Sequence, residues 1–358
     1  AYVFAFSQLV GRLIDSHGSL EEIGRTGMLF LMLWLPWTQF TWSTNALSGH
    51  RRAVQVVVLL ATATSVPMAA SISDAYGDGG PLFALSLSFI FLLGLAVLLV
   101  GYEPGTPEFT SAVRYALPNL PAVAALIVGA YLTEQWRIGF WVVALLIVVY
   151  STIKAGRGQW VVRPGHFAER HGLILIVALG EVIVAIAVPI VASLQAEGDG
   201  LAGNTIAALA ASGAFASILW WAYFDRPQRV FERRLAALDP ADRGRLARDV
   251  YSWWHAAIVG GVILVATGLE EITLHPAEAL DLDFRLILVL GMGLFLGGIE
   301  GGVWRAYHRI PPERGVAIIA IAALALAGGA FDGLVLLIAL DVIMVVVLAV
   351  EHIRLEKG

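Results

Sequence analysis

Long apolar stretches recur along this chain of 358 residues, and they constrain its fold more than any other feature. Crossing about 30 Å of hydrocarbon takes roughly 20 helical residues at about 1.5 Å each. Twelve stretches come near that length. They run over 1–14, 27–45, 53–72, 82–102, 114–133, 138–154, 171–194, 203–224, 250–270, 284–304, 315–330 and 334–352. We therefore predict an all-α, polytopic integral membrane protein with about twelve transmembrane helices, and we expect Ala1 to lie inside the first of them.

The composition fits a chain whose main partner is the lipid bilayer. Hydrophobic residues make up 58% of it and charged residues only 14%, against about 45–50% and 25% in soluble domains. The absence of cysteine excludes a disulfide scaffold, a thiolate metal site and a cysteine nucleophile. The net charge of −5 leaves no basic surplus for phosphates, so we expect no nucleic-acid partner.

The distribution of Lys and Arg predicts the orientation. Only Arg12, Arg25, Arg137 and Arg285 fall on one side of the predicted membrane, and the rest of the 23 Lys and Arg residues fall on the other. The side rich in Lys and Arg is cytoplasmic in membrane proteins. We therefore expect both termini and the hydrophilic loop 225–249 in the cytoplasm, with RVFERRLAAL in that loop forming a short amphipathic helix on the membrane surface.

The chain also shows an internal repeat, which divides it at 165/166. Aligning 1–14 with 171–194 sets Gln8 opposite Glu181, and TWSTN in the first half corresponds to LWWAYFD in the second. An acid follows an arginine after 22 residues in both halves, as Arg52 with Asp74 and Arg248 with Glu270. We predict two six-helix repeats, 1–165 and 166–358, of the same orientation. Such repeats enclose a site between them.

Several of these segments resemble a known family. The run ERHGLILIVALGEVIVAI, from Glu169 to Ile186, resembles the signature of the bacterial low temperature requirement A (LtrA) family. TWSTN, LWWAYFD and the run RLARDVYSWWHAAIVGGVILVATGLE carry the same resemblance, in order and spacing, from Ala1 to about His275. It implies a multi-pass protein of the bacterial inner membrane and says less about chemistry.

Glu181 is the clearest candidate for chemistry. It lies ten residues past His171, about 15 Å along a helix and close to the middle of the membrane. An ionisable group there costs about 2.5–3.5 kcal/mol on insertion scales. Because desolvation disfavours the anion, we expect a protonated carboxyl that can donate its proton. The alternative is a hydrogen bond that holds two helices together.

Polar residues gather at the predicted cytoplasmic helix ends around Glu181. Tyr251 and His255 are four residues apart and are expected to share one helix face. The predicted catalytic residues are Glu181, His171, His255, Glu169, Asp225 and Tyr251. Interfacial packing is the alternative for this cluster. A zinc site needs three or four converging ligands, and because no HxxxH or HExxH spacing occurs, we expect no metal and no cofactor.

A second group of residues is predicted to bind substrate. It comprises Trp42, Asn45, Trp220, Trp221, Tyr223, Gln8, Glu300 and Asp341. Aromatic walls beside one protonated carboxyl suit a hydrophobic, electron-rich molecule, because a ring face stabilises a cation. Most tryptophans, including Trp34 and Trp141, are expected to anchor at the membrane interfaces instead.

Two function classes fit these residues. The first is a membrane-embedded enzyme that protonates a lipid or isoprenoid substrate from Glu181, with chemistry like that of a terpene cyclase. No DDxxD cluster is present, which disfavours ionisation of a diphosphate. The second is a proton-coupled secondary transporter, since Pro67 and Pro189 could break their helices at a binding site. A structural or stress-response scaffold is a third interpretation, and the sequence does not determine the oligomeric state.

Overall fold

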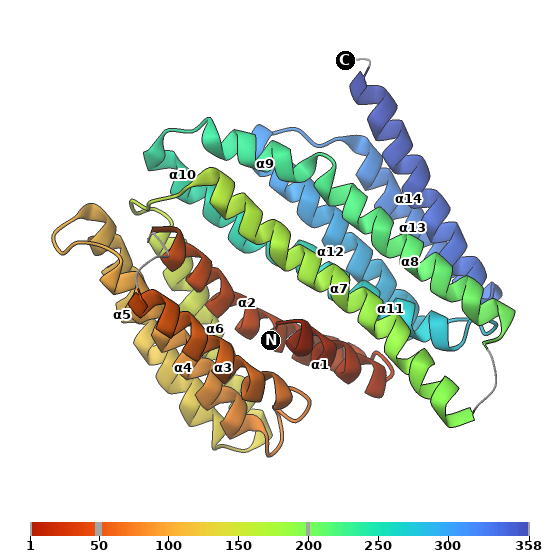
Figure 1. The fold of residues 1–358 in the computed structure, drawn as a ribbon, viewed down its shortest axis with the longest axis horizontal. Helices are drawn as coiled ribbons and strands as arrows, with labels where there is room; N and C mark the ends of the chain where they lie inside the picture. The colour runs from red at the N-terminus through yellow and green to blue at the C-terminus, as the bar shows by residue number, and fades with distance from the viewer. Residues whose placement is uncertain (1, 47–51, 198–200, 357–358) are drawn as a thin grey trace. The chain divides into compact units, whose positions relative to one another are not determined.

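The computed structural model describes residues 2–46, 52–197 and 201–356. Within these ranges the regular secondary structure is all helical, joined by turns and loops, and has no strands (Figure 1). Two cationic residues that were assigned to the cytoplasmic side, Arg51 and Lys357, lie outside the described residues.

Each predicted apolar stretch corresponds to a helix. The helices are α1 (Tyr2–Asp15), α2 (Leu20–Ala46), α3 (Arg52–Ala70), α4 (Gly80–Val100), α5 (Pro107–Ala130), α6 (Glu134–Ala155), α7 (Pro164–Glu197), α8 (Gly203–Phe224), α11 (His255–Leu274), α12 (Leu282–Tyr307), α13 (Pro312–Ala327) and α14 (Gly333–Glu356). The hydrophilic loop contains α9 (Pro227–Ala236) and α10 (Pro240–Ala247).

Ten helical segments of the described residues are long and apolar enough to cross a membrane. This confirms a polytopic membrane protein. The first two helices are not among the ten, since α1 has 14 residues and the apolar part of α2 lies between the charged run LEEIGR and the polar run TQFTWSTN. The count of twelve spans therefore stays a prediction.

The chain forms two compact units. Unit 1 comprises Ala1–Leu9, Arg25–His171 and Glu232–Trp253, and unit 2 comprises Val10–Gly24, Gly172–Phe231 and Trp254–Gly358. The boundary between His171 and Gly172 falls six residues beyond the division predicted from the repeat. The repeat itself stays a prediction.

Unit 1 is built on helices that pack in chain order. Helix α3 packs against α4, α4 against α5 and α5 against α6 (Figure 1). Between the last two, Trp141 is fully buried and its indole nitrogen donates to the Leu126 carbonyl at 3.0 Å. The prediction that Trp141 anchors at the membrane interface is therefore wrong, because its N–H finds a partner inside the helix pair.

Unit 2 repeats this order with α11, α12, α13 and α14, and α8 packs against both α14 and α11. Small residues let α11 and α12 approach closely. A Cβ placed on Gly291 would lie 2.9 Å from the Gly261 carbonyl oxygen. Such close approach of two backbones supplies the van der Waals contact that drives helix pairing in lipid.

The four arginines predicted to lie on the side poor in positive charge all have partners within their own unit. Arg12 pairs with Glu22, and Arg25 lies 2.6 Å from Glu134. Arg137 and Arg285 donate instead to backbone carbonyls in the last turn or just beyond the end of α5 and α13, where the helix dipole is negative. These cations therefore hold turns together.

Two sequence expectations about helix shape are corrected. Pro67 and Pro189 lie inside α3 and α7, which continue past them, because a long helix tolerates the loss of one hydrogen bond when neighbours restore it. The predicted helix 250–270 begins as a π-helical segment, Arg248–Trp254, before α11 starts at His255. The prediction that Tyr251 and His255 share one helix face used the α-helical spacing of four residues. Tyr251 lies in the π-helical segment, where a turn holds more residues, so that spacing does not apply there.

Candidate functional site

Glu181 lies inside the protein, near the middle of α7 in unit 2. Only 1% of its surface is exposed. Helix α7 has 34 residues and includes a candidate membrane span over Pro164–Gln195. The side chain therefore does not face lipid, and α7 holds a buried acid within a candidate membrane span.

A buried pair in unit 2 joins α8 to the start of α11. The hydroxyl of Tyr223 and Nε2 of His255 are 2.6 Å apart, and both residues are fully buried. Phe231 packs its ring edge against the imidazole at 5.8 Å between ring centres. A hydroxyl and an imidazole in such contact can pass a proton between them.

His171 sits in an aromatic enclosure in unit 1. The rings of Trp37, Phe167 and Tyr251 lie 5.0, 4.8 and 4.8 Å from the imidazole, centre to centre. Nδ1 lies 2.8 Å from the Phe167 carbonyl oxygen, which only accepts, so Nδ1 carries the proton. In the neutral ring Nε2 is then an acceptor.

The π-helical segment is held by two indoles of α2. Trp34 donates to the Ser252 carbonyl at 2.7 Å and Trp42 to the Ser252 hydroxyl at 3.1 Å. Trp34 is almost fully buried, so its predicted role as an interface anchor is wrong. Wide π-helical turns are common at functional sites.

Trp42 also lines a small pocket in unit 1. The pocket measures about 40 Å³, where one water needs roughly 10–15 Å³. Its other walls include Trp160, Tyr115 and Gln39. The Gln39 side chain is buried, and neither its amide nitrogen nor its oxygen has a hydrogen-bond partner among the described residues. An amide in that state is expected to bind water or a polar group of a ligand.

Two other predicted catalytic residues lie nearer the surface. The Glu169 side chain is 69% exposed, 3.9 Å from His166. Asp225 caps the end of α8 and pairs with Arg226 at 3.2 Å. Their exposure follows from their positions, since Glu169 lies near the start of α7 and Asp225 at the end of α8.

The remaining predicted binding residues are dispersed. Asn45 is buried and donates to the Val161 carbonyl at 2.9 Å, while Gln8 is half-buried. Glu300 is buried 3.6 Å from Arg314, and Asp341 is half-buried on α14. Trp220 and Trp221 are exposed on α8, as lipid-facing anchors are.

The predicted residues are distributed over the two units. His171, Tyr251 and Trp42 lie in unit 1, whereas Glu181, Tyr223 and His255 lie in unit 2. Sequence reasoning missed the enclosure of Trp37 and Phe167 and the pocket side chains Gln39, Tyr115 and Trp160. The amide of Gln39 within an apolar stretch was the one signal available for them. Over the described ranges, no group of three His, Asp or Glu side chains is arranged to hold a metal ion.

Comparison with known proteins identifies a family and a related protein. The family model described as bacterial low temperature requirement A protein (LtrA) matches residues 1–349. An uncharacterized protein of Rhizobium meliloti (strain 1021) is 28% identical over 313 residues, which cover 83% of this chain and 73% of that protein. No solved structure matches the chain.

Proposed function

The chain belongs to the bacterial low temperature requirement A family, and for this multi-pass membrane protein we propose acid–base catalysis on a hydrophobic substrate of the lipid or isoprenoid type. The burial of Glu181 at 1% exposure in a membrane-spanning helix carries the proposal. Carboxyls at that depth are costly, and they are retained where they do chemistry.

The proposed reaction is an isomerisation that needs no co-reactant. The Glu181 carboxylic acid gives its proton to one carbon of a substrate double bond, leaving a carboxylate and a carbocation. The cation, either directly or after attack by a second double bond has produced a new cation, loses a proton from a carbon next to the cationic centre. A base takes that proton, and Glu181 regains one, so the product has the formula of the substrate.

Two other side chains of unit 2 suit the step in which the cation loses its proton. Tyr223 and His255 form a hydrogen-bonded pair able to accept a proton. The proposal assigns no metal or cofactor to the reaction.

Proton-coupled transport is the second candidate, and the packing order of the helices favours it. Helices α3 to α6 and α11 to α14 pack in the same serial order, which suits two repeats of one orientation around a midplane site. In this proposal too, twelve helices span the bacterial inner membrane with both termini in the cytoplasm.

Protonation from water distinguishes the candidates. Membranes containing the wild type, Glu181→Gln or the exposed-carboxyl control Glu103→Gln are incubated with a total lipid extract in D₂O. Enzyme action predicts a product of unchanged formula carrying one non-exchangeable deuterium, formed by the wild type and the control and lost with Glu181→Gln. Full turnover by Glu181→Gln overturns the proposal. Solute-dependent proton uptake by proteoliposomes, abolished in Glu181→Gln, establishes transport instead.

A further inference from the structure

A second pocket lies in unit 2, where the end of α8, the start of α13 and the end of α14 meet. It measures about 280 Å³, several times the space that a few waters need. One wall is apolar and comes from Val345, Leu348 and Ala349 of α14 with Trp221 of α8. Charged side chains complete the lining, so the pocket is amphipathic.

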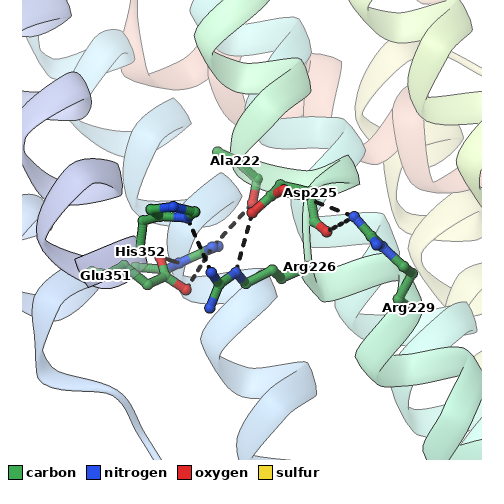
Figure 2. A network of polar contacts seen from close by, with 7 residues as sticks. Ala222, Asp225, Arg226, Arg229, Glu351 and His352 are labelled. Atoms are coloured by element: carbon green, nitrogen blue, oxygen red, sulfur yellow. Dashed lines mark hydrogen bonds and ion pairs between the residues drawn. The ribbon is translucent and has the colours of Figure 1, made fainter. Parts of the chain in front are cut away.

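The charged part of the lining contains two cations held by two acids. Arg226 lies 3.2 Å from Asp225 and donates to Nδ1 of His352 at 3.1 Å (Figure 2). Arg314 donates to Glu351 at 3.1 and 3.3 Å and to the Ala222 carbonyl at 3.0 Å. Two guanidiniums and two carboxylates therefore line one space, and Glu300, which does not line it, lies 3.6 Å from Arg314.

Arg314 keeps unused hydrogen-bonding capacity. Its side chain is only 3% exposed, and Nη1 has no hydrogen-bond partner among the described residues. A guanidinium has five N–H groups in a planar fork that matches two phosphate oxygens. A buried donor without a partner costs about 1–3 kcal/mol, so a ligand that supplies an acceptor is favoured.

We propose that this pocket binds the zwitterionic headgroup of a phospholipid that carries a primary ammonium group. The phosphate lies against Arg226 and Arg314, and the ammonium donates to Asp225 and Glu351. One acyl chain lies along the apolar wall of α14. A purely anionic headgroup brings its charge against both carboxylates without a cation to offset it. A trimethylammonium group has no N–H to donate.

The site is independent of Glu181 chemistry, and it is tested on the full chain. Delipidated protein in detergent is titrated with phosphatidylethanolamine, phosphatidylcholine or phosphatidylglycerol, and bound lipid is counted by native mass spectrometry. We expect phosphatidylethanolamine to bind about tenfold more tightly than either other lipid, the equivalent of one charge-assisted hydrogen bond. Equal binding of the three lipids overturns the proposal, and this comparison needs no variant.

Two substitutions locate the binding. Arg226→Gln, at the partly exposed rim, is expected to weaken phosphatidylethanolamine binding about tenfold. Arg233→Gln removes the same charge from an exposed side chain of α9 that does not line the pocket, and is expected to leave binding unchanged. Wild-type affinity in Arg226→Gln overturns the assignment. Competition by glycerophosphoethanolamine at the same concentration as the lipid would show that a free headgroup, without an acyl chain, is the ligand.

Discussion

Replacing Arg137 by Met tests whether a buried arginine at a helix end holds two turns together. Arg137 is buried at the start of α6, and its guanidinium donates to the carbonyls of Gly77 at 2.6 Å and Ala130 at 3.0 Å. Ala75 and Leu132 accept at 3.3 and 3.4 Å. One side chain thus joins the turn before α4 to the turn after α5.

The expected loss in free energy of unfolding follows from the two shorter hydrogen bonds, those to Gly77 and Ala130. A hydrogen bond to a charged group contributes about 1.5–3 kcal/mol, and the methionine removes one buried charge while leaving the carbonyls without a donor. We expect the free energy of unfolding to fall by about 2–4 kcal/mol. Titration of the detergent-solubilised protein with sodium dodecyl sulfate, followed by circular dichroism, measures this change.

The exposed Arg114 provides the matched control. Arg114→Met is expected to change the free energy of unfolding by less than about 0.5 kcal/mol. Arg137→Lys keeps the charge and loses the planar fork, so it is expected to fall between the wild type and Arg137→Met. A loss below about 0.5 kcal/mol for Arg137→Met would refute the structural role of this cation.

Three further predictions concern packing, the π-helical segment and pH. Gly291→Ala is expected to cost about 1–3 kcal/mol, because its Cβ would lie 2.9 Å from the Gly261 carbonyl oxygen. Gly293→Ala, with nothing within 4 Å, is expected to be neutral or stabilising in the same titration. Trp42→Phe removes the donor to Ser252 and is expected to cost about 0.5–1.5 kcal/mol in the same assay, and an unchanged midpoint would contradict that role. Burial raises the pKa of Tyr102, outside the spanning helices, to about 12; stability is therefore expected to fall between about pH 10 and 12, less steeply in Tyr102→Phe.

The candidate site shows where sequence reasoning stops. A deep carboxyl such as Glu181 is visible in the sequence, because an acid within an apolar run is costly to insert and is rare without a role. The Tyr223–His255 pair was less visible, since its members lie 32 residues apart and meet only through the packing of α8 and α11. The aromatic enclosure of His171 was missed because Trp37 and Phe167 lie on different helices, and tryptophans near membrane ends are usually anchors.

The sequence by itself determined that this chain is a bundle of helices in a membrane. Backbone groups in hydrocarbon must be satisfied within their own segment, so each apolar stretch of sufficient length becomes a helix whatever surrounds it. Only the tertiary structure decided which side chains meet, as where Arg314 of α13 lies between Glu300 and Glu351 of two other helices. Lipid is as apolar as the side chains it touches, so hydropathy does not distinguish a helix face turned to lipid from one turned to a neighbour, and close packing and interhelical hydrogen bonds make that choice.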